Sequence, residues 1–459
     1  MSADVKRVRS WKVRRAIALL KQADHLADRG RAEDALAPNE EAVAIYRGLA
    51  AADPGAFRRG LAISLERLSL RLAELGRREE ALALMEEAVT IYREPRPGGR
   101  SRYPYLASGL GNLSLRLADL GREQEALAAI EEAVMIYREV AADPAFRGDL
   151  AVSLDYLSRR LAGTGRWEQA LAAAEEAVTI HRGLPAGGEE TRTNLADALG
   201  TLALRLVDLG REHHALTPAE EAVSIYQELA AADPGPVRSY LSTPLNTMSM
   251  ILLRLGREQE ALAAIEEAAG IDRELAAASP GAGRPALALS LTRLSECLAD
   301  LGQAQDALTA IDEAVAIYRE LASASPGAFR LGIAWSLARK MTCLISLGRP
   351  AEALAASDEA AGIYRELMAA DPGSLGPGLA PLLYRQSDLL AELDRPQQAL
   401  AAMEEAVDIY RELAAATPAP FSADLADSLD NCADLLSTLE RHSDAAAARA
   451  QATQLRGHL

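Results

Sequence analysis

The sequence predicts an all-α protein, an α-solenoid of about ten antiparallel helical hairpins that fills residues 1–459 as one domain. Three observations predict this class: a helix-favouring composition, a block that recurs every 44–46 residues, and a glycine at the same place in most copies. Apolar residues make up 49% of the chain, mostly Ala and Leu, but aromatic residues only 4%. Ala, Leu, Glu and Arg lose little on entering a helix, so this mixture is typical of long packed helices.

The recurring block is the evidence for repeats. It reads GRREEALALMEEAVTIYRE at residues 76–94 and GREQEALAAIEEAVMIYRE at residues 121–139. Self-similarity at a fixed period indicates units that cannot bury their apolar face alone and therefore stack on their neighbours. The leading residue of each copy is, in order, Gly30, Gly76, Gly121, Gly165, Gly210, Gly256, Gly302, Gly348, Asp394 and Glu440.

Each copy reads as two helices. In the second copy, Leu61, Leu65, Leu68 and Leu72 recur at three- and four-residue steps, which predicts one face of a first helix. The leading glycine then ends that helix, since the residue past the last turn often needs positive φ. A second periodic run follows and stops near a segment such as Asp53-Pro54-Gly55, PRPGG at 95–99 or Asp371-Pro372-Gly373, where we expect the linker to the next hairpin.

The predicted hairpins follow from these turns and linkers. The chain ends in an Ala-rich helix whose polar outer face, with Arg449, Gln451, Gln454 and Arg456, is typical of a solenoid cap. The approximate hairpins are residues 10–52, 57–97, 103–143, 147–185, 191–233, 237–280, 285–326, 328–371, 378–417 and 421–458.

The spacing of large and small residues identifies the type of repeat. With the leading glycine counted as position 15, Leu65 is at position 4, Ser69 at 8, Ala81 at 20 and Ala88 at 27. The period alone would favour HEAT or armadillo repeats, but this pattern resembles tetratricopeptide repeats (TPRs) with lengthened helices, and in particular the arrays of actinobacterial proteins. The resemblance implies a right-handed superhelix whose concave groove is lined by the first helices, at positions 2, 5, 6, 9, 12 and 13.

Two departures from the TPR pattern stand out. The usual proline at position 32 is absent, and the second helix continues there. Lys340 and Gln386 also occupy position 7, normally an apolar packing position, in the eighth and ninth copies.

Three arginines at position 6 form a predicted ladder in the groove. Arg293, Arg339 and Arg385 are each 46 residues apart, and guanidinium groups make forked bonds to carboxylates. The resemblance therefore implies a peptide or protein partner with an acidic group or a C-terminal carboxylate. The alternative explanation is ordinary surface pairs on one helix, with Glu296 and Asp388 three residues after Arg293 and Arg385. The candidate partner-binding residues are Asn112, Tyr156, Arg159, Asn246, Arg293, Arg339, Arg385 and Asn431.

Other patterns have a functional and a structural interpretation. Position 9 is apolar in the early copies and polar in the late ones, which indicates either a two-part groove or helices rotated toward the core. The recurrent Tyr of the IYRE motif, replaced by His181 and Asp272, is typical of packing. The basic cluster of residues 6–21 around Trp11 is either a docking surface for an acidic partner or membrane, or the solvated face of the first helix.

Composition and motifs argue against several function classes. A net charge of −17 disfavours nucleic-acid binding, which depends on Lys and Arg releasing counterions. The three cysteines lack paired spacing, and no apolar run is long enough to cross a bilayer, so we expect a cytoplasmic protein without membrane association. Phosphate-loop, HExxH and GxSxG motifs are absent, and His213 and His214 are not spaced to converge on a metal. We therefore expect no catalytic residue, cofactor or metal.

The predicted function is a non-enzymatic interaction scaffold that binds a peptide or protein in its concave groove. The alternative is a regulatory or sensor subunit that controls a separate effector, a protease or an ATPase, in bacterial signalling or defence. The sequence leaves the partner and the oligomeric state open.

Overall fold

The computed structural model describes residues 3–27, 29, 31–94, 103–185, 187–232, 237–324, 329–370, 376–416 and 418–457, and every regular element in these ranges is a helix. This confirms the predicted all-α class. The chain divides into two compact units, Met1–Leu255 and Gly256–Leu459. The boundary between the two units falls inside the predicted hairpin 237–280. That residues 1–459 form a single domain stays a prediction. Gly30 and the expected linkers at 95–99 and 371–373 lie outside the described residues.

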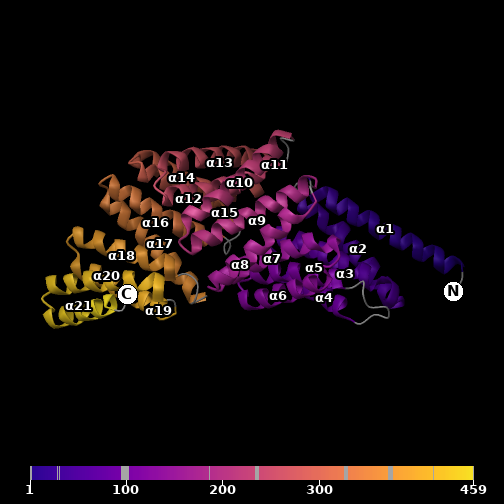
Figure 1. Ribbon diagram of the computed structural model, residues 1–459, viewed down its shortest axis with the longest axis horizontal. Helices are drawn as coiled ribbons and strands as arrows, with labels where there is room; N and C mark the ends of the chain where they lie inside the picture. The colour runs from indigo at the N-terminus through magenta and orange to yellow at the C-terminus, as the bar shows by residue number, and fades with distance from the viewer. Residues whose placement is uncertain are drawn as a thin grey trace. The chain divides into compact units, whose positions relative to one another are not determined.

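The first unit is a succession of helices in which consecutive helices pack against each other (Figure 1). Its helices are α1 (Ala3–Ala27), α2 (Ala32–Ala52), α3 (Pro54–Glu74), α4 (Arg78–Arg93), α5 (Tyr103–Ala118), α6 (Glu123–Val140), the 3-10 turn η2 (Pro144–Phe146), α7 (Arg147–Gly163), α8 (Trp167–Gly183), α9 (Glu189–Asp208), α10 (Glu212–Ala232), α11 (Val237–Tyr240) and α12 (Ser242–Arg254).

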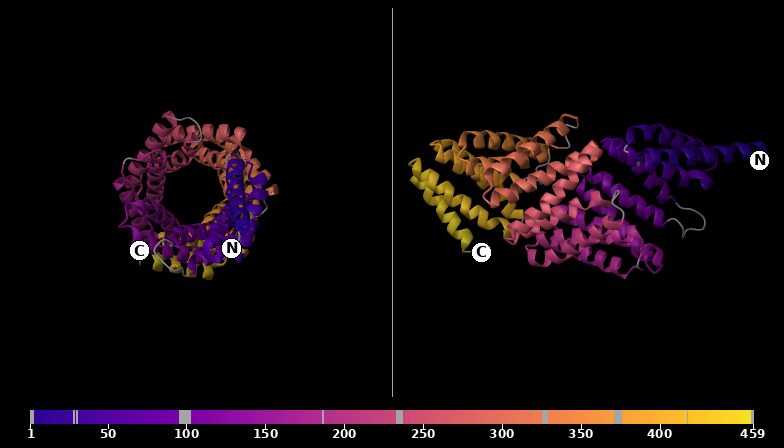
Figure 2. Two further views of the ribbon diagram at one scale, coloured as in Figure 1. Left: turned by 90° about the vertical axis from the view of Figure 1, so that its right-hand side faces the viewer. Right: turned by 90° about the horizontal axis from the view of Figure 1, so that it is seen from above.

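The second unit repeats the same pairing of neighbours, which the views in Figure 2 show from two further directions. Its helices are α13 (Glu258–Ala278), α14 (Pro280–Asp300), α15 (Ala304–Ala324), α16 (Arg330–Ser346), α17 (Pro350–Ala370), α18 (Gly376–Glu392), α19 (Pro396–Ala416), α20 (Pro418–Thr438) and α21 (His442–Arg456). The outer face of α21 is exposed, and Arg449 and Arg456 pair with aspartates of α20.

The turn inside each hairpin depends on a left-handed residue. The leading glycines from Gly76 to Gly348 all have positive φ, between 67° and 75°. At Gly76 the turn is a Schellman motif, in which the amide of Arg77 donates to the Leu72 carbonyl at 2.9 Å and that of Gly76 to Ala73 at 3.0 Å. Asp394 and Glu440 adopt the same conformation without being glycine, with φ of 56° and 61°.

The connections between hairpins are shorter than predicted. Pro54 is the first residue of α3 and Pro280 the first of α14, so the expected linkers at these places shrink to Asp53 and Ser279. Proline is favoured there because its fixed φ suits a helix start and its missing N–H would have no partner. The side chain of Asp53 caps α3 by accepting from the Ala56 amide at 3.2 Å. The predicted starts at residues 57 and 285 were therefore wrong.

Small residues let the two helices of a hairpin approach each other. Position 20 is an alanine in the second to tenth copies, from Ala81 to Ala445, and position 27 is an alanine from Ala88 to Ala452; all are buried. At position 8, the hydroxyl of Ser69 donates to the Ala81 carbonyl at 2.7 Å, and Ser387 does the same to Ala399. The packing that the TPR resemblance implies is thus present.

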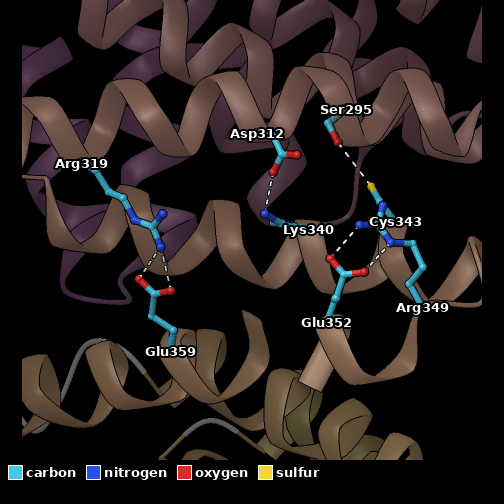
Figure 3. Close-up of polar contacts among 8 residues, drawn as sticks. All are labelled: Ser295, Asp312, Arg319, Lys340, Cys343, Arg349, Glu352 and Glu359. Atoms are coloured by element: carbon cyan, nitrogen blue, oxygen red, sulfur yellow. Dashed lines mark hydrogen bonds and ion pairs between the residues drawn. The ribbon is translucent and has the colours of Figure 1, made fainter. Parts of the chain in front are cut away.

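The two polar residues at position 7 have dedicated partners. The Lys340 ammonium lies 2.6 Å from Asp312 (Figure 3). Gln386 donates to Asp358 at 2.6 Å. Both aspartates occupy position 25 of the preceding copy, where the first six copies and the ninth carry the longer Glu. The polar groups of Lys340 and Gln386 therefore have partners on the preceding copy, in place of the apolar contact usual at position 7.

A row of ion pairs links successive second helices. The arginine at position 32, where TPRs usually have proline, reaches a glutamate at position 26 of the next copy; Arg319 and Glu359 lie 2.7 Å apart (Figure 3). The same pair recurs as Arg47–Glu87, Arg93–Glu132, Arg138–Glu176, Arg182–Glu221, Arg273–Glu313 and Arg365–Glu405. At position 32, an arginine that links neighbouring repeats thus replaces the proline that would end the helix.

Candidate functional site

Three adjoining pockets form a groove in the first unit, which we call the unit 1 groove. Their volumes are about 470, 280 and 180 Å³. The first two share Tyr156 and His181, and the last two share Arg159, Asp197 and Tyr226, so the pockets are continuous. The walls come mainly from the first helices α5, α7, α9 and α12, as the TPR resemblance implies.

Three of the predicted binding residues line this groove. Asn112 of α5 is in the largest pocket, Tyr156 of α7 in the two larger ones, and Arg159 in the central and smallest ones. Arg159 lies 2.9 Å from Asp155 and also donates to the Thr201 hydroxyl at 3.3 Å. All three side chains therefore line the groove, and their part in partner binding stays a prediction.

The centre of the groove contains buried acidic and aromatic groups that we did not predict. Asp155 is 7% exposed, and burial raises its pKa despite the Arg159 guanidinium. The Tyr226 hydroxyl donates to Asp197 at 2.6 Å. His181 is 4% exposed, and burial lowers its pKa, so the imidazole is neutral near pH 7.

The sequence did contain a signal for this centre. His181 is one of two replacements for the recurrent Tyr, and the smaller ring sits where two of the pockets meet. The recurrent Tyr itself is a packing residue, and it is buried in the other copies, as at Tyr137 and Tyr226. The other replacement, Asp272, is fully buried and accepts from the Ser290 hydroxyl at 2.5 Å, so the irregularity alone does not identify a cavity.

A separate pocket of about 240 Å³ lies in the second unit. It is lined by Trp335, Arg339, Thr342, Tyr364 and Arg385, together with neighbouring apolar residues of α16 and α18. Burial, and then the like charge of Arg339, lowers the pKa of Arg385. Two members of the predicted ladder therefore share one concave site with an indole ring.

The ladder arginines contact neighbouring hairpins. Arg339 of α16 lies 2.8 Å from Glu296 of α14, and Arg385 of α18 donates to Thr342 of α16 at 2.8 Å. The Arg293 guanidinium lies 5.7 Å from the centre of the Trp335 ring. Stacking thus brings position 9 of one copy beside position 6 of the next.

The two remaining candidates differ from expectation. Asn246 does not line the unit 1 groove: it is 6% exposed, and its side-chain amide donates to the Ser242 carbonyl of its own helix at 2.9 Å. Its amide is thus part of the core of α12, which corrects the prediction. Asn431 of α20 is half-buried and donates to the Tyr384 hydroxyl of α18.

The described part of the basic N-terminal cluster packs against its neighbours. Arg9 pairs with Asp53 and stacks on Phe57 at 4.2 Å, and Arg15 pairs with Glu41. Trp11 is 52% exposed. These contacts favour the structural interpretation for Arg9 and Arg15, while the side chains of Lys6 and Arg7 lie outside the described residues.

Metal-binding side chains are not gathered into a site in the described ranges. No group of three or more His, Cys, Asp and Glu side chains there could hold a metal ion. Cys297, Cys343 and Cys432 are buried thiols. Among the described residues, no helix combines the length and the apolar character needed to span a membrane.

Comparisons with known proteins agree with this architecture. One tetratricopeptide repeat model matches residues 61–94, 106–143, 150–184 and 195–234, and a second matches 243–275 and 380–413. A model described as anaphase-promoting complex subunit 5 matches residues 282–340. No curated protein sequence matches the chain.

Several solved structures are similar. The apo form of RapI is 12% identical, with a TM-score of 0.55 over 87% of this chain and 98% of that chain. A Rap protein complexed with Competence and Sporulation Factor is 14% identical, with a TM-score of 0.53 over 87% and 98%. BtubC (BKLC) from P. vanneervenii is 20% identical over 53% of this chain and 92% of that chain, with a TM-score of 0.44. The two Rap structures share the fold.

Glycine-turned hairpins, alanines at the helix contacts and a groove along the first helices define an α-helical repeat protein built for interaction. The chain is a tetratricopeptide repeat protein. Such arrays are protein-interaction scaffolds.

Proposed function

We propose that the chain is a non-enzymatic scaffold that binds an extended segment of a partner protein in the unit 1 groove. The continuity of three pockets along four first helices carries this proposal. A continuous row of pockets suits an extended peptide better than a compact metabolite, and the walls carry aromatic, carboxylate and amide groups that can bind a backbone and its side chains. A cytoplasmic location is part of the proposal.

Gly200 offers a direct test of this groove. It lies in α9 and lines the smallest pocket, and a Cβ added there meets nothing within 4 Å. Gly200→Trp therefore adds an indole at the wall of this pocket from a position where the Cβ itself meets no neighbour. Gly48→Trp is the matched control, because Gly48 is an exposed helical residue of α2 with equally open surroundings.

The test begins with random peptides displayed on phage and selected on the immobilised full chain. Fluorescence anisotropy then measures the affinity of selected peptides for each variant. We expect Gly200→Trp to weaken binding at least tenfold and Gly48→Trp to leave it within twofold. Equal affinities for the two variants would show that the groove is not the binding site.

The pocket of the second unit supports a partner carboxylate as a further contact. Arg385 is exposed at its rim, and its own hydrogen bond goes to a neutral hydroxyl, that of Thr342. We expect Arg385→Gln to weaken a peptide with a free C-terminal carboxylate and to spare the same peptide with a C-terminal amide. If both peptides lose affinity alike, the carboxylate assignment is wrong.

Regulation of a separate effector is the second candidate function. It is supported by the shared fold of a Rap protein that is described in complex with Competence and Sporulation Factor. In this proposal a factor bound in the groove changes which effector the scaffold holds. The test measures the activity of the purified effector in the presence of the chain and of its Gly200→Trp variant. A difference between the two would indicate regulation, and equal activity would indicate simple tethering.

A further inference from the structure

The centre of the unit 1 groove has the chemistry of a site for a positively charged side chain. Asp155 of α7 and Asp197 of α9 both line the central pocket, and Asp149 and Glu190 line the adjoining one. Arg159 is the single Lys or Arg among the lining residues of the central pocket, and it pairs with Asp155 at 2.9 Å. The carboxylates therefore outnumber the cations.

One carboxylate oxygen of the central pocket is buried without a hydrogen-bond partner among the described residues. The side chain of Asp155 is more than nine-tenths buried, since only 7% of the residue is exposed. Its Oδ1 is the oxygen that lacks a hydrogen-bond partner in the described part of the chain. A buried acceptor without a partner is disfavoured, so a ligand donor that reaches this oxygen gains by satisfying it. Asp197 lies on the same pocket wall and is oriented by the Tyr226 hydroxyl at 2.6 Å.

Aromatic rings complete the surroundings. Tyr156, Tyr226 and Tyr240 line the same central pocket, and Tyr240 is 56% exposed at its mouth. Aromatic faces attract guanidinium groups more readily than they attract carboxylates. The imidazole of His181, neutral and smaller than the Tyr of other copies, leaves space without adding positive charge.

We infer that the central pocket binds an arginine side chain of the partner peptide, with its guanidinium between Asp155 and Asp197 and against the tyrosine rings. This inference rests on the proposed function and names the recognised side chain. A planar guanidinium suits it better than an ammonium, because the fork can serve two carboxylates and stack on a ring at once. The volume of about 280 Å³ is sufficient for one such side chain.

The experiment uses peptides selected on the intact chain, each made also with citrulline in place of arginine, which removes the charge and keeps the shape. Anisotropy gives the affinity of both peptides for the wild type and for an Asp155→Asn/Asp197→Asn variant. The control, Asp300→Asn/Asp306→Asn, makes the same charge change at exposed positions in the second unit.

We expect the wild type and the control variant to bind the citrulline peptide at least tenfold more weakly than the arginine peptide. For the Asp155→Asn/Asp197→Asn variant, the two affinities should differ less than threefold. Retained affinity of that variant for the citrulline peptide shows that it is folded. Selected peptides that need the groove but lack arginine, or a citrulline effect that persists in the variant, would overturn the inference and leave the proposed function standing. Peptides indifferent to Gly200→Trp would remove the proposed function itself.

Discussion

At the scale of single residues, the hairpin turn shows how a backbone requirement selects a side chain. Seven glycines hold φ near 70° at the turn, and the helix then closes with Schellman hydrogen bonds. Asp394 keeps these bonds, since its amide donates to Ala391 at 3.1 Å and that of Arg395 to Leu390 at 2.9 Å. The turn is thus preserved with an L-residue in a conformation that disfavours its Cβ by roughly 1–2 kcal/mol.

Asp394→Gly should therefore stabilise the second unit. We expect a gain of about 0.5–1 kcal/mol, because the steric penalty falls more than the entropy of the unfolded chain rises. Hydrogen exchange of amides in α18 and α19 measures it locally. The reverse change at an equivalent turn, Gly348→Asp, should destabilise α16 and α17 and leave no amide there with slower hydrogen exchange. If both substitutions were stabilising, this account would be contradicted.

Glu66 links a buried charge to pH. Burial raises its pKa to about 7 from the usual 4.5, although Tyr92 donates to its Oε2 at 3.2 Å. The folded state therefore holds more protons than the unfolded state between these two values. The free energy of unfolding should fall as pH rises from about 4.5 to 7 and level off above, by at most about 3 kcal/mol for this group.

Glu66→Gln should remove that fall, because the amide does not titrate. Urea unfolding at pH 5.5 and pH 8 gives the difference between variant and wild type, which cancels other titrating groups. Glu79→Gln, at an exposed position of α4, is the control and should follow the wild type. A Glu66→Gln variant that loses as much stability with pH as the wild type would exclude Glu66 as the source.

At the scale of helices, the close approach within a hairpin depends on alanines with no exposed surface. Ala360 of α17 is fully buried, whereas Ala355 of the same helix is exposed. Ala360→Leu should lower the free energy of unfolding by about 1–3 kcal/mol through overpacking, and Ala355→Leu should change it by less than about 0.5 kcal/mol. Chemical unfolding of both variants checks this; equal effects would mean that the interface tolerates wider spacing.

The sequence predicted the hairpins well because each has strong local signals. Position 15 marks the turn, and positions 20 and 27 mark the contact between the helices. The helix starts at Pro54 and Pro280 were missed because proline favours a helix start as much as it ends a helix. The groove was predicted in part: Asn112, Tyr156 and Arg159 follow from their positions, but Asp155 and His181 became a site only through stacking of several copies.

At the scale of the whole molecule, two electrostatic effects oppose each other. The net charge of −17 disfavours a compact state through self-repulsion, which added salt screens. The arginine–glutamate pairs at positions 32 and 26 are exposed, and such pairs contribute only about 0–1 kcal/mol each, which salt also screens. Gln227 occupies position 32 in the fifth copy, so the row lacks a charged member there.

We therefore expect the net charge to dominate and the thermal midpoint to rise when NaCl is increased from 20 mM to 500 mM. Sodium sulfate would also strengthen apolar burial, so chloride is the appropriate salt. A variant with Arg319→Gln and Glu359→Gln removes one pair at constant net charge and should keep the same salt response. A midpoint that falls with salt in the wild type, and falls less in that variant, would show instead that the ion-pair row between second helices outweighs the repulsion of the acidic chain.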